Sequence, residues 1–92
     1  MSSGYEIEFL KSAADQLRKI SRPGRERISA ALDALARDPR PVLSARLKEN
    51  PRLHRIRVGS YRIIYQIEDE RLVILVVRIR HHRDAYRKLA GL

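Results

Sequence analysis

The chain has 92 residues, with 20 Lys and Arg against 11 Asp and Glu, so its formal net charge is +9 at pH 7. This length suffices for one modest hydrophobic core and predicts a single domain over residues 1–92. The charge favours a polyanionic partner: nucleic acid first, an acidic protein second and a membrane surface third. The chain has no cysteine, which excludes disulfides and thiolate metal sites.

Arginine accounts for 16 of the 20 cations and lysine for 4. The planar guanidinium group of arginine presents a fork of N–H donors that matches phosphate, so this excess of arginine favours nucleic acid as the partner. Genomic base composition is the alternative explanation for the arginines on predicted helix surfaces. The N-terminal segment shows no signal-peptide pattern, and no apolar stretch approaches the length of a membrane span. A cytoplasmic protein with no membrane partner is therefore the simplest expectation.

The segment YEIEF, residues 5–9, alternates apolar and acidic residues, which predicts a short strand with one buried face. From Lys11 the apolar period becomes helical, and it continues beyond SRPG, where Pro23 suits the first turn of a second helix. The following DPRP run ends that helix because proline and its preceding residue disfavour helical backbone. The pattern predicts a helical hairpin over residues 11–38 and a loop with an ambiguous middle over 39–53.

The segment HRIRVGSYRIIYQ, residues 54–66, alternates on both sides of a Gly-Ser pair. With Gly-Ser as a two-residue hairpin loop, three pairs form on one face: Val58–Tyr61, Ile56–Ile63 and His54–Tyr65. The same register sets Arg57 directly opposite Arg62, and like charges opposed across a ladder destabilise it. This predicted apposition needs a reason other than stability.

The next segment, RLVILVVRI, predicts a third strand whose β-branched run indicates burial on both faces. The chain then ends on HHRDAYRKLAGL, which suits a short C-terminal helix. The element order β-α-α-β-β-β predicts a two-layer α+β fold: a helical hairpin packed on a small antiparallel-rich sheet, with the first strand at one edge. The predicted core consists of Tyr5, Ile7, Phe9, Leu17, Ile28, Leu32, Leu35, Ile56, Ile63, Tyr65, Ile67, Ile74 and Val76.

Basic residues dominate the opposite face of the predicted hairpin. From Arg52 to Gln66 the chain has four arginines and no acidic residue. Unpaired arginines on a rigid sheet face leave their donors available to phosphate. The alternative is an ordinary solvated strand face, which explains Arg55 and Arg57 but not Arg62, because Arg62 lies in the middle strand opposite another arginine.

A second cluster follows the third strand and comprises Arg78, Arg80, His81, His82, Arg83 and Tyr86. Strict alternation from Leu72 would place Arg78 and Arg80 on the core face. The strand is therefore expected to end or bulge near Arg78. Charge, histidine and tyrosine gathered at the exit of a central strand favour a functional site over packing.

The segment LKENPRLHRIRVGSYRIIYQIEDERLVILVVRIRHHRDAYR resembles the RelE/ParE toxin superfamily of bacterial type II toxin–antitoxin systems, and its RelE branch in particular. The resemblance lies in HRIRVG, YRIIYQI and HHRDAY, while the first half of the chain matches in pattern alone. It implies a RelE-like fold and a ribosome-dependent endoribonuclease that cuts mRNA in the decoding A site. The mRNA 2′-hydroxyl would attack the adjacent phosphate without metal or cofactor. The implied partners are the ribosome with its mRNA and a cognate antitoxin.

Site residues follow from the same resemblance by position. Arg62 matches the arginine that contacts the scissile phosphate, and Arg80 a second arginine that assists the transition state or the leaving oxygen. Tyr86 matches the tyrosine that stacks on the nucleotide. Further contacts to RNA are expected from Arg52, Arg55, Arg78 and Arg83.

Arg55 and Arg57 fall where one branch of the family has two lysines, one of them proposed as general base. Guanidinium stays protonated in proteins, so neither arginine readily accepts a proton, although Arg57 can still stabilise a charged transition state. A base, if one is needed, comes from elsewhere, and His81 and His82 are the candidates because histidine is the side chain most often used as a general base. His54 is expected to pack in the core against Tyr65.

Two other functions remain open at this point. One is a ParE-like toxin of the same fold, which poisons DNA gyrase and needs no RNA-cutting residues. The other is a catalytically inactive basic RNA-binding module. The tail RHHRDAYR keeps the arginine and tyrosine expected of the RNA-cleaving branch and so favours that branch.

Overall fold

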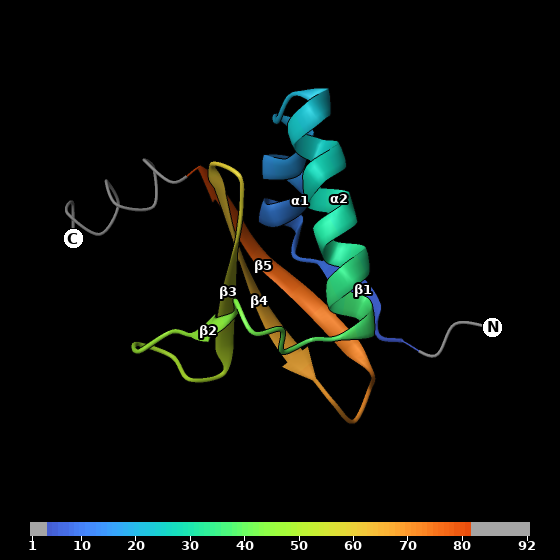
Figure 1. The fold of residues 1–92 in the computed structure, drawn as a ribbon, viewed down its shortest axis with the longest axis vertical. Coiled ribbons are helices and arrows are strands. Elements are labelled where there is room, and N and C mark those ends of the chain that lie inside the picture. The colour runs from blue at the N-terminus through green and yellow to red at the C-terminus, as the bar shows by residue number, and fades with distance from the viewer. Residues whose placement is uncertain (1–3, 82–92) are drawn as a thin grey trace.

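The computed structural model describes residues 4–81 (Figure 1). Its elements, in chain order, are β1 (Glu6–Phe9), α1 (Lys11–Arg18), α2 (Arg22–Arg37), β2 (Ala45–Arg46), β3 (Leu53–Val58), β4 (Tyr61–Glu68) and β5 (Val73–His81). The predicted helical hairpin and three C-terminal strands are confirmed. The short C-terminal helix predicted from the sequence lies outside the described residues.

The strands form one sheet in the order β1-β5-β4-β3-β2. β1 lies at one edge, as predicted, and runs parallel to β5, while the other neighbours are antiparallel. The other edge strand, β2, was not predicted, because two residues are too short to show a period-two pattern. It pairs Ala45 with Arg55 and Arg46 with His54.

The β3–β4 hairpin has the predicted register, including Arg57 opposite Arg62. Gly59 has φ +60° and Ser60 has no positive φ, the pattern of a two-residue turn with glycine in its first central position. This turn twists in the same sense as the strands that it joins, so it fixes the pairing of every residue between Leu53 and Gln66.

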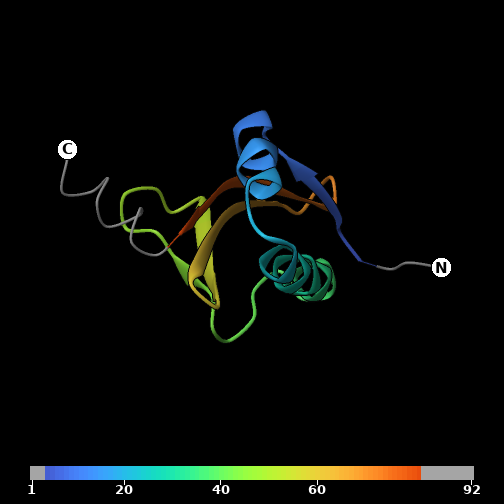
Figure 2. The same ribbon diagram turned by 90° about the horizontal axis from the view of Figure 1, so that it is seen from above.

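The helices and the sheet enclose the core on one face of the sheet. Figure 2 shows the twisted sheet curving around α2, and both views place the helices beside β1 and β5, with β2 at the far edge. Ile28, Leu32 and Leu35 of α2 are buried against strand residues such as Ile63 and Ile74. All the predicted core residues belong to this cluster or pack against it. Among the described residues, no helix is long and apolar enough to cross a membrane.

A β-bulge interrupts the pairing of β4 with β5. Tyr65 pairs with Val76 and Ile64 with Arg78, so Val77 is the extra residue. The bulge moves Ile79 to the core face, where it is 2% exposed, and Arg78 to the outer face. Of the two outcomes predicted near Arg78, an end of the strand or a bulge, the structure has the bulge, and β5 continues to His81. The predicted burial of this strand on both faces is incomplete, because Val77 is only half-buried.

Candidate active site

Three arginines lie side by side across three adjacent strands. Arg62 of β4 pairs with Arg57 of β3 on one side and with Arg80 of β5 on the other. We call these residues the arginine row. Directly opposed side chains in a sheet have Cβ atoms roughly 4.5–5.5 Å apart. The bulge at Val77 creates the row, because without it Arg80 would point into the core.

The neighbouring position along the strands adds two more cations to the same face. Arg55 of β3 and Arg78 of β5 both pair with Ile64 of β4. Arg55 is half-buried and Arg78 exposed, while Ile64 between them is apolar. The structure therefore brings together five of the arginines expected in the site, on the face of the sheet turned away from the helices.

Most of these arginines have no acidic partner in the part of the chain that the structure describes. Within residues 4–81, none of Arg55, Arg57, Arg78 and Arg80 forms an ion pair. The Nε atom of Arg80 is buried and has no hydrogen-bond partner in this part of the chain. A buried donor without a partner costs free energy, and adjacent like charges add to that cost. An anion bound on this face would relieve both.

Arg52 lies apart from the arginine row. It precedes the first residue of β3, and its backbone N–H donates to the Oδ1 atom of Asn50 at 3.1 Å. At about 3.3 Å per residue, it is roughly 16 Å along the strand from Arg57. Any contact that Arg52 makes with RNA would involve a nucleotide several positions away from one held by the row.

His81, one of the two histidines considered as a base, is on the helix side of the sheet. It pairs with Tyr61, and the two rings meet edge to face with centroids 5.4 Å apart. Arg62 and Arg80 project from the opposite face, so the register separates His81 from the arginine row. His82, Arg83 and Tyr86 lie outside the described residues.

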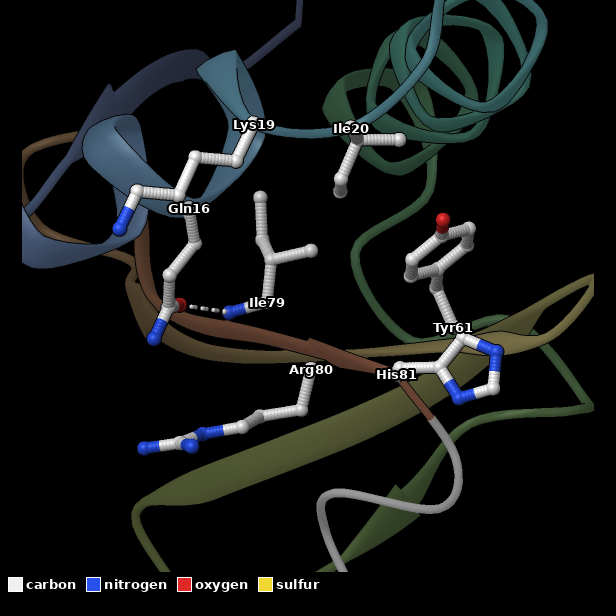
Figure 3. A pocket seen from close by; sticks show the side chains of 7 residues that line it. All are labelled: Gln16, Lys19, Ile20, Tyr61, Ile79, Arg80 and His81. Atoms are coloured by element: carbon white, nitrogen blue, oxygen red, sulfur yellow. Dashed lines mark hydrogen bonds between the residues drawn. The ribbon is translucent and has the colours of Figure 1, made fainter.

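A cavity of about 370 Å³ opens beside His81 on that helix side (Figure 3). Its lining residues are Gln16, Lys19, Ile20, Tyr61, Ile79, Arg80 and His81. A second cavity, about 300 Å³, is lined by Leu43, Ala45, Arg55, Ile56 and Arg57 at the β2 edge. Neither cavity was predictable from the sequence, since in each of them helix or loop residues meet strand residues that are far away in the chain.

His54 occupies the core position expected for it. It is 8% exposed and stacks on Tyr65 with ring centroids 5.6 Å apart. Burial lowers the pKa of His54, and the positive charges of Arg40 and Arg46 lower it further. Among residues 4–81, no group of three His, Asp or Glu is placed to hold a metal ion.

Comparison with known proteins places these features in a family. The sequence profile of the family described as "ParE toxin of type II toxin-antitoxin system, parDE" matches residues 7–86. Toxin RelG of Mycobacterium tuberculosis is 30% identical, covering 91% of this chain and 98% of the relative. The mRNA interferase toxin RelE of Escherichia coli is 29% identical over 89% of this chain and 90% of its own length.

The solved structures agree with the sequences. The intact E. coli RelBE toxin–antitoxin complex contains a chain that superimposes with a TM-score of 0.75 at 28% identity, over 84% of this chain and 95% of that chain. The residues matched by the family profile, 7–86, include the helical hairpin and the strands that carry the arginine row. The chain belongs to the RelE/ParE superfamily of type II toxins.

Proposed function

We propose that this toxin is an mRNA interferase, an endoribonuclease that cuts mRNA in the ribosomal A site. The observation that carries the proposal is the arginine row, three cations at directly paired positions on adjacent strands. Such a row is costly for a sheet and well suited to a phosphodiester. Two relatives that are 29% identical to this chain are named mRNA interferases, which supports the same assignment.

The proposed reaction needs charge stabilisation above all. The 2′-oxygen bonds to the adjacent phosphorus as a base takes up its proton, and the bond from phosphorus to the 5′-oxygen breaks as that oxygen takes up a proton, leaving a 2′,3′-cyclic phosphate and a 5′-hydroxyl. The phosphorane-like transition state carries about two negative charges. Arg62, flanked by Arg57 and Arg80, would hold its non-bridging oxygens, and pre-arranged cations of this kind commonly supply the largest catalytic contribution.

Proton transfer is assigned to no member of the arginine row, because guanidinium does not give up its proton near neutral pH. His81 faces the helices, so its ring would reach the row only around the end of β5. We propose Tyr86 as the residue that stacks on the nucleotide, with His82 as the alternative base and Arg83 as a further phosphate contact.

The proposed partners are the ribosome with its A-site mRNA and a cognate antitoxin. RelE of E. coli was solved in complex with the antitoxin RelB. For this chain we propose an inhibitor that presents acidic side chains to the arginine row, because Arg55, Arg57, Arg78 and Arg80 have no ion pair within residues 4–81.

A second candidate, inhibition of DNA gyrase, is favoured by the name of the matching family profile. Two assays separate the candidates. Purified toxin is added to ribosomes programmed with mRNA, and primer extension maps any cut; in parallel, gyrase supercoiling is measured with the same preparation. Cuts in the A-site codon with normal supercoiling are expected. Inhibited supercoiling without mRNA cuts would replace this proposal with the ParE-like one.

A further inference from the structure

Within residues 4–81, no strand pairs with the outer edge of the last part of β5. β1 ends at Phe9, which pairs with Val76, whereas β5 continues to His81. Beyond Val76, α1 replaces β1 beside the strand: the Oε1 atom of Gln16 accepts a hydrogen bond from the Ile79 N–H at 2.8 Å (Figure 3). A side chain thus takes the place of a backbone acceptor at the position directly before Arg80.

This hydrogen bond fixes the orientation of the Gln16 amide. Since Oε1 is engaged by Ile79, the Nε2 group is turned away from the strand and offers its two N–H donors. In Figure 3 the nitrogen atoms of Lys19, Gln16 and Arg80 follow one another along the same side of the cavity. Neither Lys19 nor Arg80 forms an ion pair within residues 4–81. Three donors therefore lead from the sheet over the edge of β5 toward α1.

The cavity behind these donors has the character of a nucleotide site. Its volume, about 370 Å³, is in the range of small-ligand sites, which is roughly 300–1,000 Å³. Tyr61 and His81 supply aromatic surface, and Ile20 an apolar wall. Among the described residues, 4–81, no acidic side chain lines it. Aromatic surface beside cations is the combination by which proteins hold single-stranded nucleic acid.

We propose that this cavity is a second RNA subsite, which holds a nucleotide flanking the cleaved phosphodiester. The strand leaves the arginine row beside Arg80 and crosses the outer edge of β5. Its next phosphate meets Lys19 and the Nε2 group of Gln16, and its base enters the cavity beside Tyr61. The inference rests on the proposed RNA substrate, but it concerns binding and does not depend on where the strand is cut.

The experiment compares RNA oligonucleotides of two lengths, each with a 2′-deoxy sugar at the cleavage position so that no nucleophile is present. A dinucleotide reaches only the arginine row, while a tetranucleotide also reaches the cavity. Binding is measured by fluorescence anisotropy at low salt. Wild-type protein should bind the tetranucleotide about tenfold more tightly, since a charge-assisted hydrogen bond to phosphate supports a gain of that order.

Two variants test the subsite, and both should lose most of this length-dependent gain while binding the dinucleotide as wild type does. Lys19→Ala removes the cation. Gln16→Glu retains an acceptor for the Ile79 N–H but replaces the donor with a carboxylate, so it separates the structural role of the side chain from the proposed binding role. Lys11→Ala, which removes an exposed cation from the first residue of the same helix, should leave both affinities unchanged.

The outcomes of the two proposals are distinguishable. The subsite is overturned if the wild type shows no length-dependent gain in affinity, or if the gain survives in both Lys19→Ala and Gln16→Glu. This holds even if mRNA is cleaved on ribosomes. Absence of ribosomal cleavage overturns the proposed function, while a gain lost on Lys19→Ala still supports RNA in the cavity. Arg62→Ala should weaken binding of both lengths by the same factor, because both contain the phosphate at the row.

Discussion

At the β4–β5 turn, Arg40 donates to Asp69 through two hydrogen bonds, of 2.9 and 3.4 Å, and the Tyr5 hydroxyl donates to the same carboxylate at 2.7 Å. We call these residues the Asp69 cluster. At the other end of the same strands, Arg62 has an arginine on either side. One region surrounds a carboxylate with donors from two distant parts of the chain. The other places like-charged donors side by side on adjacent strands.

This contrast shows two roles of arginine, one in stabilising the fold and one in binding an anion. In the Asp69 cluster, Arg40 and Tyr5 tie the loop after α2 and the start of β1 to the β4–β5 turn, and the Tyr65 hydroxyl donates to the Pro39 carbonyl beside them at 2.8 Å. The arginine row instead places like charges on neighbouring strands, where their repulsion lowers the stability of the sheet. We expect stability to depend on the first region and activity on the second.

The largest expected effect is on cleavage. Arg62→Ala should reduce mRNA cutting on programmed ribosomes by a hundredfold or more, the usual cost of removing a contact that strengthens in the transition state. Arg62→Lys should recover little of the loss, because lysine lacks the two-pronged donor geometry. Arg37→Ala, an exposed arginine in the last turn of α2, is the matched control and should cut normally. Full cleavage by well-folded Arg62→Ala would remove the arginine row from the reaction.

How much of the arginine row was predictable depends on the residue. The apposition of Arg57 and Arg62 follows from the Gly-Ser turn, since a two-residue loop fixes the register. The alternation of β5 requires the strand to end or bulge near Arg78, since Arg78 and Arg80 would otherwise face the core. The pairing of Arg80 with Arg62 depends further on which residue is the extra one in the bulge, and the sequence does not specify that residue. Arg80 joined the predicted site through the family resemblance instead.

The Asp69 cluster and the Gln16 contact gave no sequence signal. Tyr5 and Asp69 are 64 residues apart, and Gln16 and Ile79 are 63 apart. Each contact exists because β1 lies parallel to β5 at the sheet edge, and hydrophobic periodicity does not determine which strands are neighbours. The core residues were predicted correctly for the opposite reason, because the local hydrophobic periodicity of each helix or strand is enough to identify its buried face.

A second effect concerns RNA binding and its dependence on salt. Each phosphate contact with single-stranded RNA contributes a slope of about −0.7 to the plot of log affinity against log salt concentration. Arg78→Ala, next to the row on β5, should lower affinity at low salt and reduce this slope by about 0.7 if Arg78 contacts one phosphate. Isotherms at several salt concentrations measure it, with Arg37→Ala as control. An unchanged slope would place Arg78 outside the RNA interface.

A third effect, on pH-dependent stability, belongs to the core side of the sheet. Burial lowers the pKa of His54 in the folded protein, so the unfolded chain binds the proton more readily. Stability is therefore fully present above the unfolded pKa, about 6.5, and declines as the pH falls from there toward the folded pKa. His54→Phe keeps the ring on Tyr65 and removes the titration. Its melting temperature should fall less than that of the wild type between pH 7.5 and 5.5; equal falls would mean that other groups cause the decline.

The smallest effects are on melting temperature, and they test the comparison most directly, because substitutions in the Asp69 cluster and in the arginine row should change it in opposite directions. Hydrogen bonds from Arg40 first, and then from Tyr5, lower the pKa of Asp69, so its carboxylate stabilises the fold above its unfolded pKa and the contribution is lost as the pH falls through the folded value. Asp69→Asn should lower the melting temperature at pH 7 by a few degrees at most, since the cluster is exposed to solvent. It should leave cleavage unchanged.

Arg57→Ala should do the reverse and leave the melting temperature unchanged or slightly higher, because it relieves a like-charge pair worth on the order of a few tenths to one kcal/mol. Added salt should reduce the difference in melting temperature between Arg57→Ala and the wild type, since screening weakens the repulsion that the substitution removes. Thermal melts at low and moderate salt test both expectations, with cleavage measured on the same preparations. A destabilised Arg57→Ala would show that the arginine row is held by contacts that offset its charge, and the division between a stabilising and a functional end of the sheet would then be wrong.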